Sequence, residues 1–289
     1  MEDMRKWDGQ AGWGWLLGNV YDCVEFLTVC WTFLMLTIFP LYVIDGYHDI
    51  GGYKFSFFSG VSTLFLIPGL ALALFWRIGS LAGTGRESRS WRRELGGRRA
   101  GFPRFQGISS LDVCVILYTV ACLISYLQSD YKEDAWAGVD GWNMGLHTQL
   151  LMSGAYYLIS RFFPWRKKGA SGKNRKSDCH RRAARRRPVS MQPEPDSKGV
   201  SFGGAVVIGG ALVGSGLTFL LGILHRFGID PLGMYLGIDS SYQIRFLSTI
   251  GQATWYSSYV CTVLPIGLCL FYISQERKVR VWSGVYCVL

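Results

Sequence analysis

Charged residues are scarce in this chain. Only 17% of its 289 residues are Asp, Glu, Lys or Arg, against roughly 25% in an ordinary soluble domain. Hydrophobic residues make up 49% and aromatic residues 15%, which excludes a disordered or fibrous protein. The charges stand in blocks between long apolar runs, and this pattern predicts an integral membrane protein of the all-α class.

Several motifs of common enzyme and transporter classes are absent from the sequence. The glycines of 203–216 are never followed by Lys and Ser or Thr, so a Walker A loop for ATP is excluded. The four histidines show no HExxH or paired spacing, and there is no CxxC pair, so neither a metal nor another cofactor is expected. The acids nearest to span interiors, Glu25 and Asp112, begin their apolar runs, where helix capping explains them better than ion transport.

Apolar runs of about 20 residues are long enough to cross a membrane as helices. The sequence predicts a polytopic bundle of six complete spans and a partial seventh run of nine residues, which looks like a helix cut short or, alternatively, an interfacial tail. No small-residue cleavage site follows the first run, so it is predicted to be an uncleaved span. The predicted spans are 24–44, 55–76, 111–127, 146–163, 202–224 and 253–273, and the partial run is 281–289.

Lys and Arg are distributed unequally between the two sides of this topology. If the amino terminus is cytoplasmic, 24 of the 30 basic residues lie on the cytoplasmic side, mainly in 78–110 and 164–201. The three loops on the opposite side are net acidic. Because positive charge is retained on the cytoplasmic side, the sequence predicts a plasma-membrane protein with a cytoplasmic amino terminus.

The chain divides into a four-span region at 1–163, a basic linker at 164–201 and a second membrane region at 202–289. The linker lacks apolar periodicity. Its excess of positive charge fits topology determination and contact with anionic lipid better than binding of a nucleic acid. Within 202–289, Gly210 and Gly214 are four residues apart, a spacing that lets another helix pack closely.

The outer loops are rich in acids, aromatics and glycines. Such residues suit a glycan, because sugar rings stack on Trp and Tyr while carboxylates accept hydrogen bonds from hydroxyls. An ordinary aromatic belt at the membrane surface is the alternative. Arg245 stands out in this acid-rich compartment, since a guanidinium can hold a phosphate through two hydrogen bonds, although an interfacial Arg is also common. The candidate glycan contacts are Asp45, His48, Trp142, Asp230 and Gln252.

The stretch RFLSTIGQATWYSSYVCTVLPIG, from Arg245 to Gly267, resembles the start of the membrane domain in the O-antigen ligase and O-antigen polymerase family of bacteria. Earlier stretches resemble the amino-terminal half of ligase-domain proteins from anaerobic Gram-positive bacteria. The resemblance implies a GT-C-like membrane fold and covers nearly all of the chain except the basic linker. These earlier stretches are Met35–Phe58, Ser110–Leu146 and Gly228–Ile238.

For the complete family, the resemblance implies a metal-independent glycosyltransferase on the outer face. It transfers a glycan from undecaprenyl diphosphate to an acceptor hydroxyl, with a His as base and Arg residues on the leaving diphosphate. Only Arg245 matches a motif residue; His48, His147 and His225 match no catalytic position, and no catalytic residue is assigned. Gln252 and the two residues after it replace the family's Asn-Pro-Asn element.

Family members have ten to twelve spans and a catalytic outer loop, so this chain is expected to be an amino-terminal half that is unable to catalyse alone. The alternative is a non-enzymatic scaffold or accessory subunit that binds lipid-linked glycan or, through the surface of 203–216, partner helices. A small transporter is disfavoured by the scarcity of charges within the spans.

Overall fold

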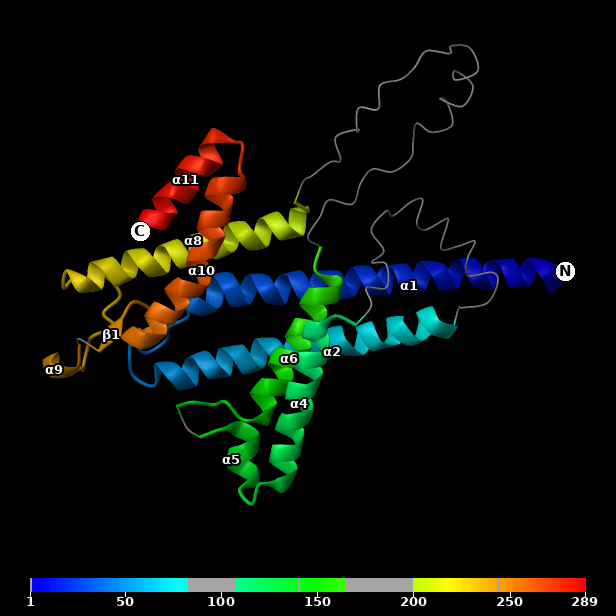
Figure 1. Ribbon diagram of the computed structural model, residues 1–289, viewed down its shortest axis with the longest axis horizontal. Coiled ribbons are helices and arrows are strands. Elements are labelled where there is room, and N and C mark those ends of the chain that lie inside the picture. Colours follow the sequence, from blue (N-terminus) through cyan, green and yellow to red (C-terminus); the bar gives the residue numbers. More distant parts are fainter. Residues whose placement is uncertain (1, 83–107, 140, 165–199, 244) are drawn as a thin grey trace, which may run out of the picture.

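A computed structural model describes residues 2–82, 108–139, 141–164, 200–243 and 245–289 (Figure 1). Most of the two predicted basic segments, 78–110 and 164–201, lies outside these residues. Among the described residues the regular structure is helical except for one short hairpin of β1 (Phe246–Leu247) and β2 (Gly251–Gln252). Its helices are α1 (Glu2–Phe33), η1 (Leu34–Ile38), η2 (Phe39–Leu41), α2 (Ile50–Ala82), α4 (Ser110–Gln128), α5 (Lys132–Ala137), α6 (Leu146–Phe162), α8 (Phe202–Arg226), α9 (Ser240–Gln243), α10 (Ala253–Ile273) and α11 (Arg277–Val288).

Five helical stretches of the described residues are long and apolar enough to cross a membrane. They correspond to five of the six predicted spans, and this supports the prediction of a multi-pass helical membrane protein. The sixth predicted span, 146–163, is helix α6, whose 17 residues make it the shortest of the six. The five stretches are Trp15–Leu41, Ile50–Ser80, Ser110–Gln128, Phe202–Arg226 and Ala253–Ile273.

The predicted partial run forms most of helix α11, which begins at Arg277 rather than at Val281. This helix turns back along α10. Its Tyr286 hydroxyl contacts Ser215 Oγ of α8 at 2.9 Å and also donates to the carbonyl of Val263 in α10, at 3.3 Å. Three helices are therefore joined through one tyrosine.

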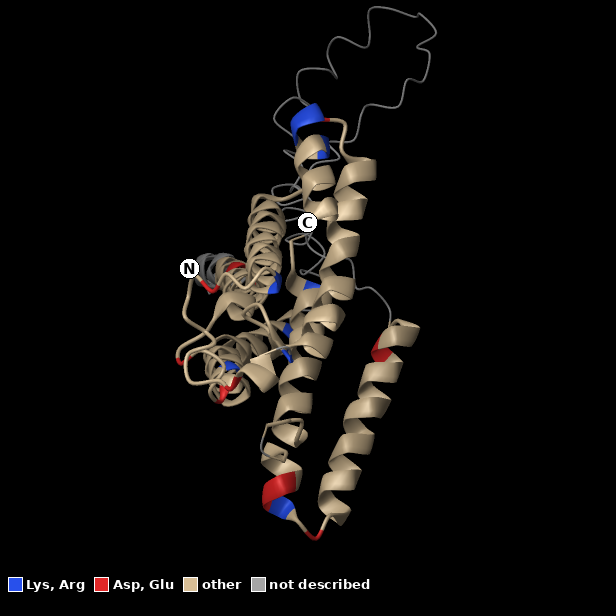
Figure 2. Cartoon of the chain, turned by 90° about the vertical axis from the view of Figure 1, so that its left-hand side faces the viewer, with Lys and Arg blue, Asp and Glu red and all other residues tan. Residues whose placement is uncertain are grey.

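The long helices run in two directions (Figure 1). Helices α1, α2 and α8 lie along the long axis of the molecule, while α4, α6, α10 and α11 run across them. In Figure 2, which looks nearly along α1, α2 and α8, the upright helices carry their charged residues mainly near their ends. The arrangement is thus not a bundle of parallel helices, and length and apolarity, rather than a shared direction, identify the candidate spans.

The main apolar core lies where α1, α2 and α6 meet. Tyr21 of α1 packs against Phe162 of α6, with ring centroids 5.5 Å apart, and Leu66 and Leu158 are almost fully buried between the helices. In the same region the indole nitrogen of Trp31 donates to Ser62 Oγ at 3.0 Å. This core fixes the first two helices against each other, and with them the loop that joins them.

Helix α1 ends irregularly, with a turn of π-helix and then a short 3-10 helix that contains Pro40. Lys54 of α2 is buried beside this end and donates to the carbonyls of Phe39 and Pro40 at 2.9 and 3.1 Å. The Lys54 amine there donates to the last carbonyls of the helix, which carry partial negative charge. The basic residue that the sequence places in an outer loop therefore stabilises a helix end.

The glycine-rich helix α8 packs closely against η1, as its small-residue spacing predicts. A Cβ atom on Gly214 would lie 2.6 Å from the carbonyl oxygen of Thr37, and one on Gly210 would lie 2.4 Å from Thr37 Oγ1. The same helix leaves Gly209 and Gly216 with open space beside them. The close-packing face of α8 is therefore used within this chain.

Asp112 begins α4 as a helix cap, as the sequence predicts. The side chain of Ser109 accepts from a backbone N–H of the first turn, while Asp112 accepts from the backbone N–H of Ser109 at 2.8 Å. Asp112 also accepts from the hydroxyl of Tyr156 at 2.8 Å and pairs with Arg161, both in α6. The acid therefore serves helix capping and helix pairing together.

Candidate functional site

Two loops at one end of the long helices form a compact unit. The first, residues 42–49, joins η2 to α2, and the second, residues 227–252, joins α8 to α10. The backbone N–H of Tyr47 donates to the carbonyl of Met234 at 3.3 Å. Gly46, with φ +54°, lies so close that a Cβ atom would stand 2.7 Å from the same carbonyl oxygen. Tyr47, Ile50 and Met234 are buried together and form a small core of their own.

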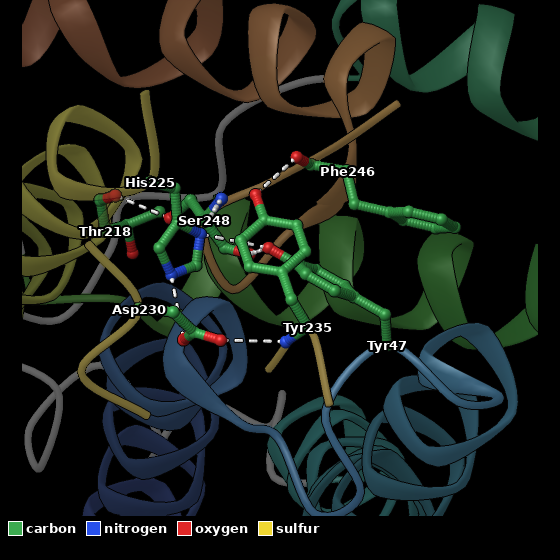
Figure 3. A network of polar contacts seen from close by, with 7 residues as sticks. All are labelled: Tyr47, Thr218, His225, Asp230, Tyr235, Phe246 and Ser248. Carbon is green, nitrogen blue, oxygen red and sulfur yellow. Dashed lines mark hydrogen bonds and ion pairs between the residues drawn. The ribbon is translucent and has the colours of Figure 1, made fainter. Parts of the chain in front are cut away.

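His225, at the end of α8, lies at the centre of this unit (Figure 3). It is 7% exposed, and its Nδ1 accepts from the backbone N–H of Ser248 at 3.2 Å. The hydroxyl of Tyr47 lies 3.0 Å from the same nitrogen and donates to the carbonyl of Ser248 at 2.7 Å. Since a backbone N–H can only donate, Nδ1 carries no proton, and the neutral ring carries its proton on Nε2.

Burial raises the pKa of the Tyr47 phenol well above its ordinary value, and nearby Tyr235 and Asp230 raise it further. The hydroxyl therefore remains protonated and available as a donor. The hydroxyl donates this proton to the Ser248 carbonyl, while His225 accepts from the Ser248 N–H. Both backbone groups of Ser248 are therefore bonded to side chains from other segments of the chain.

Ser248 has a φ of +56°, which is unusual for a residue other than glycine. It is fully buried, and its hydroxyl donates to the carbonyl of Thr218 at 2.5 Å. Although a Ser, a His and an Asp meet here, the serine oxygen is directed to α8 rather than to the imidazole. The arrangement therefore fixes a turn and does not create a serine nucleophile.

Asp230 holds the start of the second loop. One carboxylate oxygen accepts from the backbone N–H of Tyr235 at 2.8 Å, and the other lies 3.6 Å from His225 Nε2, longer than a direct hydrogen bond. Burial tends to raise the pKa of Asp230, but the backbone donors and His225 outweigh it and hold that pKa below its ordinary value. The hydroxyl of Tyr235 donates to the carbonyl of Phe246 at 2.9 Å and so reaches the hairpin.

Arg245 stands directly before the hairpin that this network supports. Its carbonyl accepts from the N–H of Ala253 at 3.0 Å, so the residue is tied to the first turn of α10. Its side chain is exposed, and the guanidinium carbon lies 5.0 Å from the centre of the Tyr242 ring. A cation on an aromatic face at a loop surface is accessible to an anionic ligand.

The other predicted glycan contacts occupy three places. Asp45 and His48 are exposed on the first loop, and the His48 ring lies against Gly237 of the second loop. Gln252 is exposed next to the hairpin turn and precedes α10. Trp142 is 76% exposed in the loop between α5 and α6. The structure thus brings five of the six predicted residues onto two contacting loops and leaves Trp142 on a third.

The structural roles of Tyr47, His225 and Ser248 were not predicted from the sequence. The acids, glycine and aromatic residue of the segment DGYHD predicted a glycan surface, whereas Tyr47 is buried and anchors the loop. Its contact with His225 spans 178 positions of the chain. No local pattern indicates such a pairing, and only the fold reveals it.

Among the described residues, no group of three or more His, Cys, Asp or Glu side chains could hold a metal ion. The seven described cysteines are free thiols, and Cys179 lies outside the described residues. The polar groups at this end of the molecule are joined by hydrogen bonds, and two arginines there, Arg226 and Arg245, are exposed. No protein-family model, curated protein or solved structure matches the chain.

Proposed function

We propose that this protein acts in bacterial cell-surface polysaccharide biosynthesis, as an O-antigen ligase or polymerase type of membrane glycosyltransferase. Its ligand is a glycan carried on undecaprenyl diphosphate, and Arg245 binds the diphosphate on the outer face of the plasma membrane. The sequence motif from Arg245 to Gly267 suggests this family, and the motif's arginine provides the anion site.

One observation carries the proposal: Arg245 is an exposed cation whose backbone is hydrogen-bonded to Tyr242 and Ala253. The Ser248 turn beside it is fixed through Tyr47, Thr218 and His225. A binding group positioned by a rigid loop loses little conformational freedom when a ligand arrives, which favours affinity.

The chemistry of this reaction suits an arginine. In glycan transfer the bond between the anomeric carbon and the diphosphate oxygen breaks, and a bond from that carbon to the acceptor oxygen forms. The acceptor hydroxyl loses its proton to a base, to which no described residue is assigned. Negative charge develops on the leaving diphosphate, and a guanidinium stabilises it with two parallel hydrogen bonds.

Charge on the described loops supports the proposed orientation. The second loop carries Asp230 and Asp239 against one basic residue, Arg245, while the turn between α10 and α11 leads into Arg277, Lys278 and Arg280, all exposed. Basic residues at a cytoplasmic surface also attract anionic lipid, at about 1 kcal/mol for each charge. With α10 as a span, these two charge groups lie on opposite sides of the membrane.

Replacing Arg245 in the source bacterium tests the proposal. Cells that carry Arg245→Ala are expected to lose surface polysaccharide and to accumulate the glycan on undecaprenyl diphosphate, measured by mass spectrometry of extracted lipid. Arg245→Lys keeps the charge without the two-pronged geometry and should retain part of the function.

Arg226 provides a matched control, because it is an exposed arginine at the outer end of α8. Arg226→Ala should leave both measurements at the wild-type level. Normal surface polysaccharide in Arg245→Ala cells, at normal protein abundance, would refute the proposed function.

A further inference from the structure

A cavity of about 810 Å³ lies between α4, α5 and the first turn of α6, separate from the His225 unit. It is at the end of α4 where the chain turns into α5, on the side that the charge pattern predicts to be outside. Most of its wall is small or apolar. The aromatic and polar side chains that matter for ligand chemistry are Tyr118, Tyr126, Ser129, Asp134, Trp142 and Gln149.

The polar side of the cavity is held by hydrogen bonds. The hydroxyl of Tyr118 donates to Gln149 Oε1 at 2.8 Å, and Gln149 Nε2 donates to the carbonyl of Met144 at 3.2 Å. These bonds join α4 to α6 and fix the amide. Such a fixed amide and phenol can share further hydrogen bonds with a ligand, since each oxygen has a second acceptor site.

The aromatic wall is supported from behind. Trp136 of α5 meets the Tyr126 ring edge to face, with centroids 6.0 Å apart. Lys132 donates to the carbonyls of Tyr126 and Leu127 at 2.7 and 2.8 Å, which caps α4 and ties α5 to it. The Lys132 ammonium is thus bonded to the end of α4.

The charge of the cavity selects against anions. Asp134 is exposed at its edge, and none of the described residues that line it is Lys, Arg or His. A phosphate or diphosphate would meet a carboxylate without a compensating cation. Aromatic rings next to a carboxylate, an amide and hydroxyls instead suit an uncharged polyhydroxylated ring, which stacks on one face and donates hydrogen bonds from its edge.

We propose that this cavity binds a neutral glycan and is the acceptor site of the protein. The acceptor role rests on the proposed function, in which Arg245 takes the anionic carrier, whereas glycan binding at the cavity does not depend on it. The loop that carries Trp142 contacts the start of α2, where a Cβ atom on Gly51 would lie 3.7 Å from the Gly141 carbonyl oxygen. Gly51 directly follows the first loop of the His225 unit, so the two surfaces are connected through α2.

Photolabelling of the full chain in phosphatidylcholine nanodiscs tests the inference. The probe is a neutral glucose tetrasaccharide that carries a diazirine, and mass spectrometry locates the label. We expect labelling in the segments that contain Tyr126 and Trp142, at least fivefold weaker in Trp142→Ala and in Asp134→Asn.

Two matched controls separate the cavity from general effects. Trp282→Ala removes a tryptophan of similar exposure, 73% against 76% for Trp142. Glu133→Gln removes an exposed acid from the same turn of α5 that does not line the cavity. Both variants should label like the wild type.

Wild-type labelling in Trp142→Ala and Asp134→Asn would overturn the inference. Equal labelling by a sulfated tetrasaccharide would do the same, and so would a photoactivatable phosphatidylcholine that labels the cavity where the glucose probe does not. Binding of undecaprenyl diphosphate, measured on the same samples, distinguishes the two proposals. If that binding fails while the cavity is still labelled, the proposed function fails and the glycan site stands.

Discussion

Among single residues, His225 and Ser248 determine how the two contacting loops are built. Ser248 adopts a positive φ and has its N–H, carbonyl and hydroxyl all bonded to other segments. An unusual backbone conformation persists only where the surroundings determine it. Because Arg245 lies three positions earlier, the same contacts determine where the candidate anion site stands.

Replacing His225 should destabilise the protein. In His225→Phe the buried N–H of Ser248 loses its acceptor, which costs about 1–3 kcal/mol of unfolding free energy. His225→Asn offers an amide oxygen near the position of Nδ1 and should recover part of the loss. Denaturant titration of the purified protein, followed by circular dichroism, measures the difference.

His48→Phe is the control, because His48 is an exposed histidine of the first loop. It should unfold at close to the wild-type denaturant concentration. Equal stability of His225→Phe and wild type would show that the Ser248 turn does not depend on the imidazole.

The stability of the fold should depend on pH through the carboxylate of Asp230. Its pKa is lower in the folded protein than its ordinary value. The charged carboxylate therefore stabilises the fold above that ordinary value, and this contribution is lost as the pH falls through the folded pKa. The stability difference between wild type and Asp230→Asn should shrink on acidification. A constant difference from neutral to acid pH would contradict the assignment.

At the scale of elements, helix α8 shows why two glycines on one helix differ. The Gly214 position faces backbone atoms of Thr37, and that of Gly216 faces open space. The backbone at Thr37 cannot move aside as a flexible side chain could. An added methyl group at 214 must therefore displace η1.

Alanine substitutions at these two positions should have opposite effects. Overpacking in Gly214→Ala is expected to cost about 1–3 kcal/mol, more than the roughly 1 kcal/mol that alanine contributes to helix propensity. Gly216→Ala gains the propensity without the clash and should be neutral or more stable. Denaturant midpoints of the two variants provide the comparison, and a stabilised Gly214→Ala would refute close packing on η1.

Helix boundaries could be predicted closely from the sequence where an apolar run has clear ends. The run 253–273 coincides with α10, and 111–127 differs from α4 by one residue at each end. The first two predicted spans, 24–44 and 55–76, begin too late, because α1 begins in a polar stretch and α2 includes buried Lys54; the first also extends past η2, which ends at Leu41. A charged residue interrupts an apolar run in the sequence without interrupting the helix.

At the scale of the whole molecule, the sequence indicated an all-α membrane protein but not the crossing of its helices. Apolar runs reveal that helices are long enough to span, and α4 satisfies this although none of its residues is buried. Helix direction depends on contacts such as those of Tyr21 with Phe162 and of Tyr286 with Ser215. These pairs join residues far apart in the chain, so the apolar periodicity of the sequence does not predict them.

Cysteine labelling tests the proposed orientation. In a background whose native cysteines are replaced by alanine, Ser240→Cys should react with a membrane-impermeant maleimide in intact cells. Gln275→Cys, beyond α10, should react only after permeabilisation, because the basic residues that follow hold it on the cytoplasmic side. The reverse pattern, or reaction of both in intact cells, would contradict the orientation.

The central claim is that Arg245 binds the diphosphate of a lipid-linked glycan, and the affinity of the full chain for undecaprenyl diphosphate in nanodiscs measures it directly. Loss of a charge-assisted hydrogen bond reduces the binding free energy by about 1.5–3 kcal/mol, which raises the dissociation constant roughly tenfold to hundredfold. We expect a loss of this size in Arg245→Ala and wild-type affinity in Arg226→Ala. Equal affinities in all three proteins would contradict it.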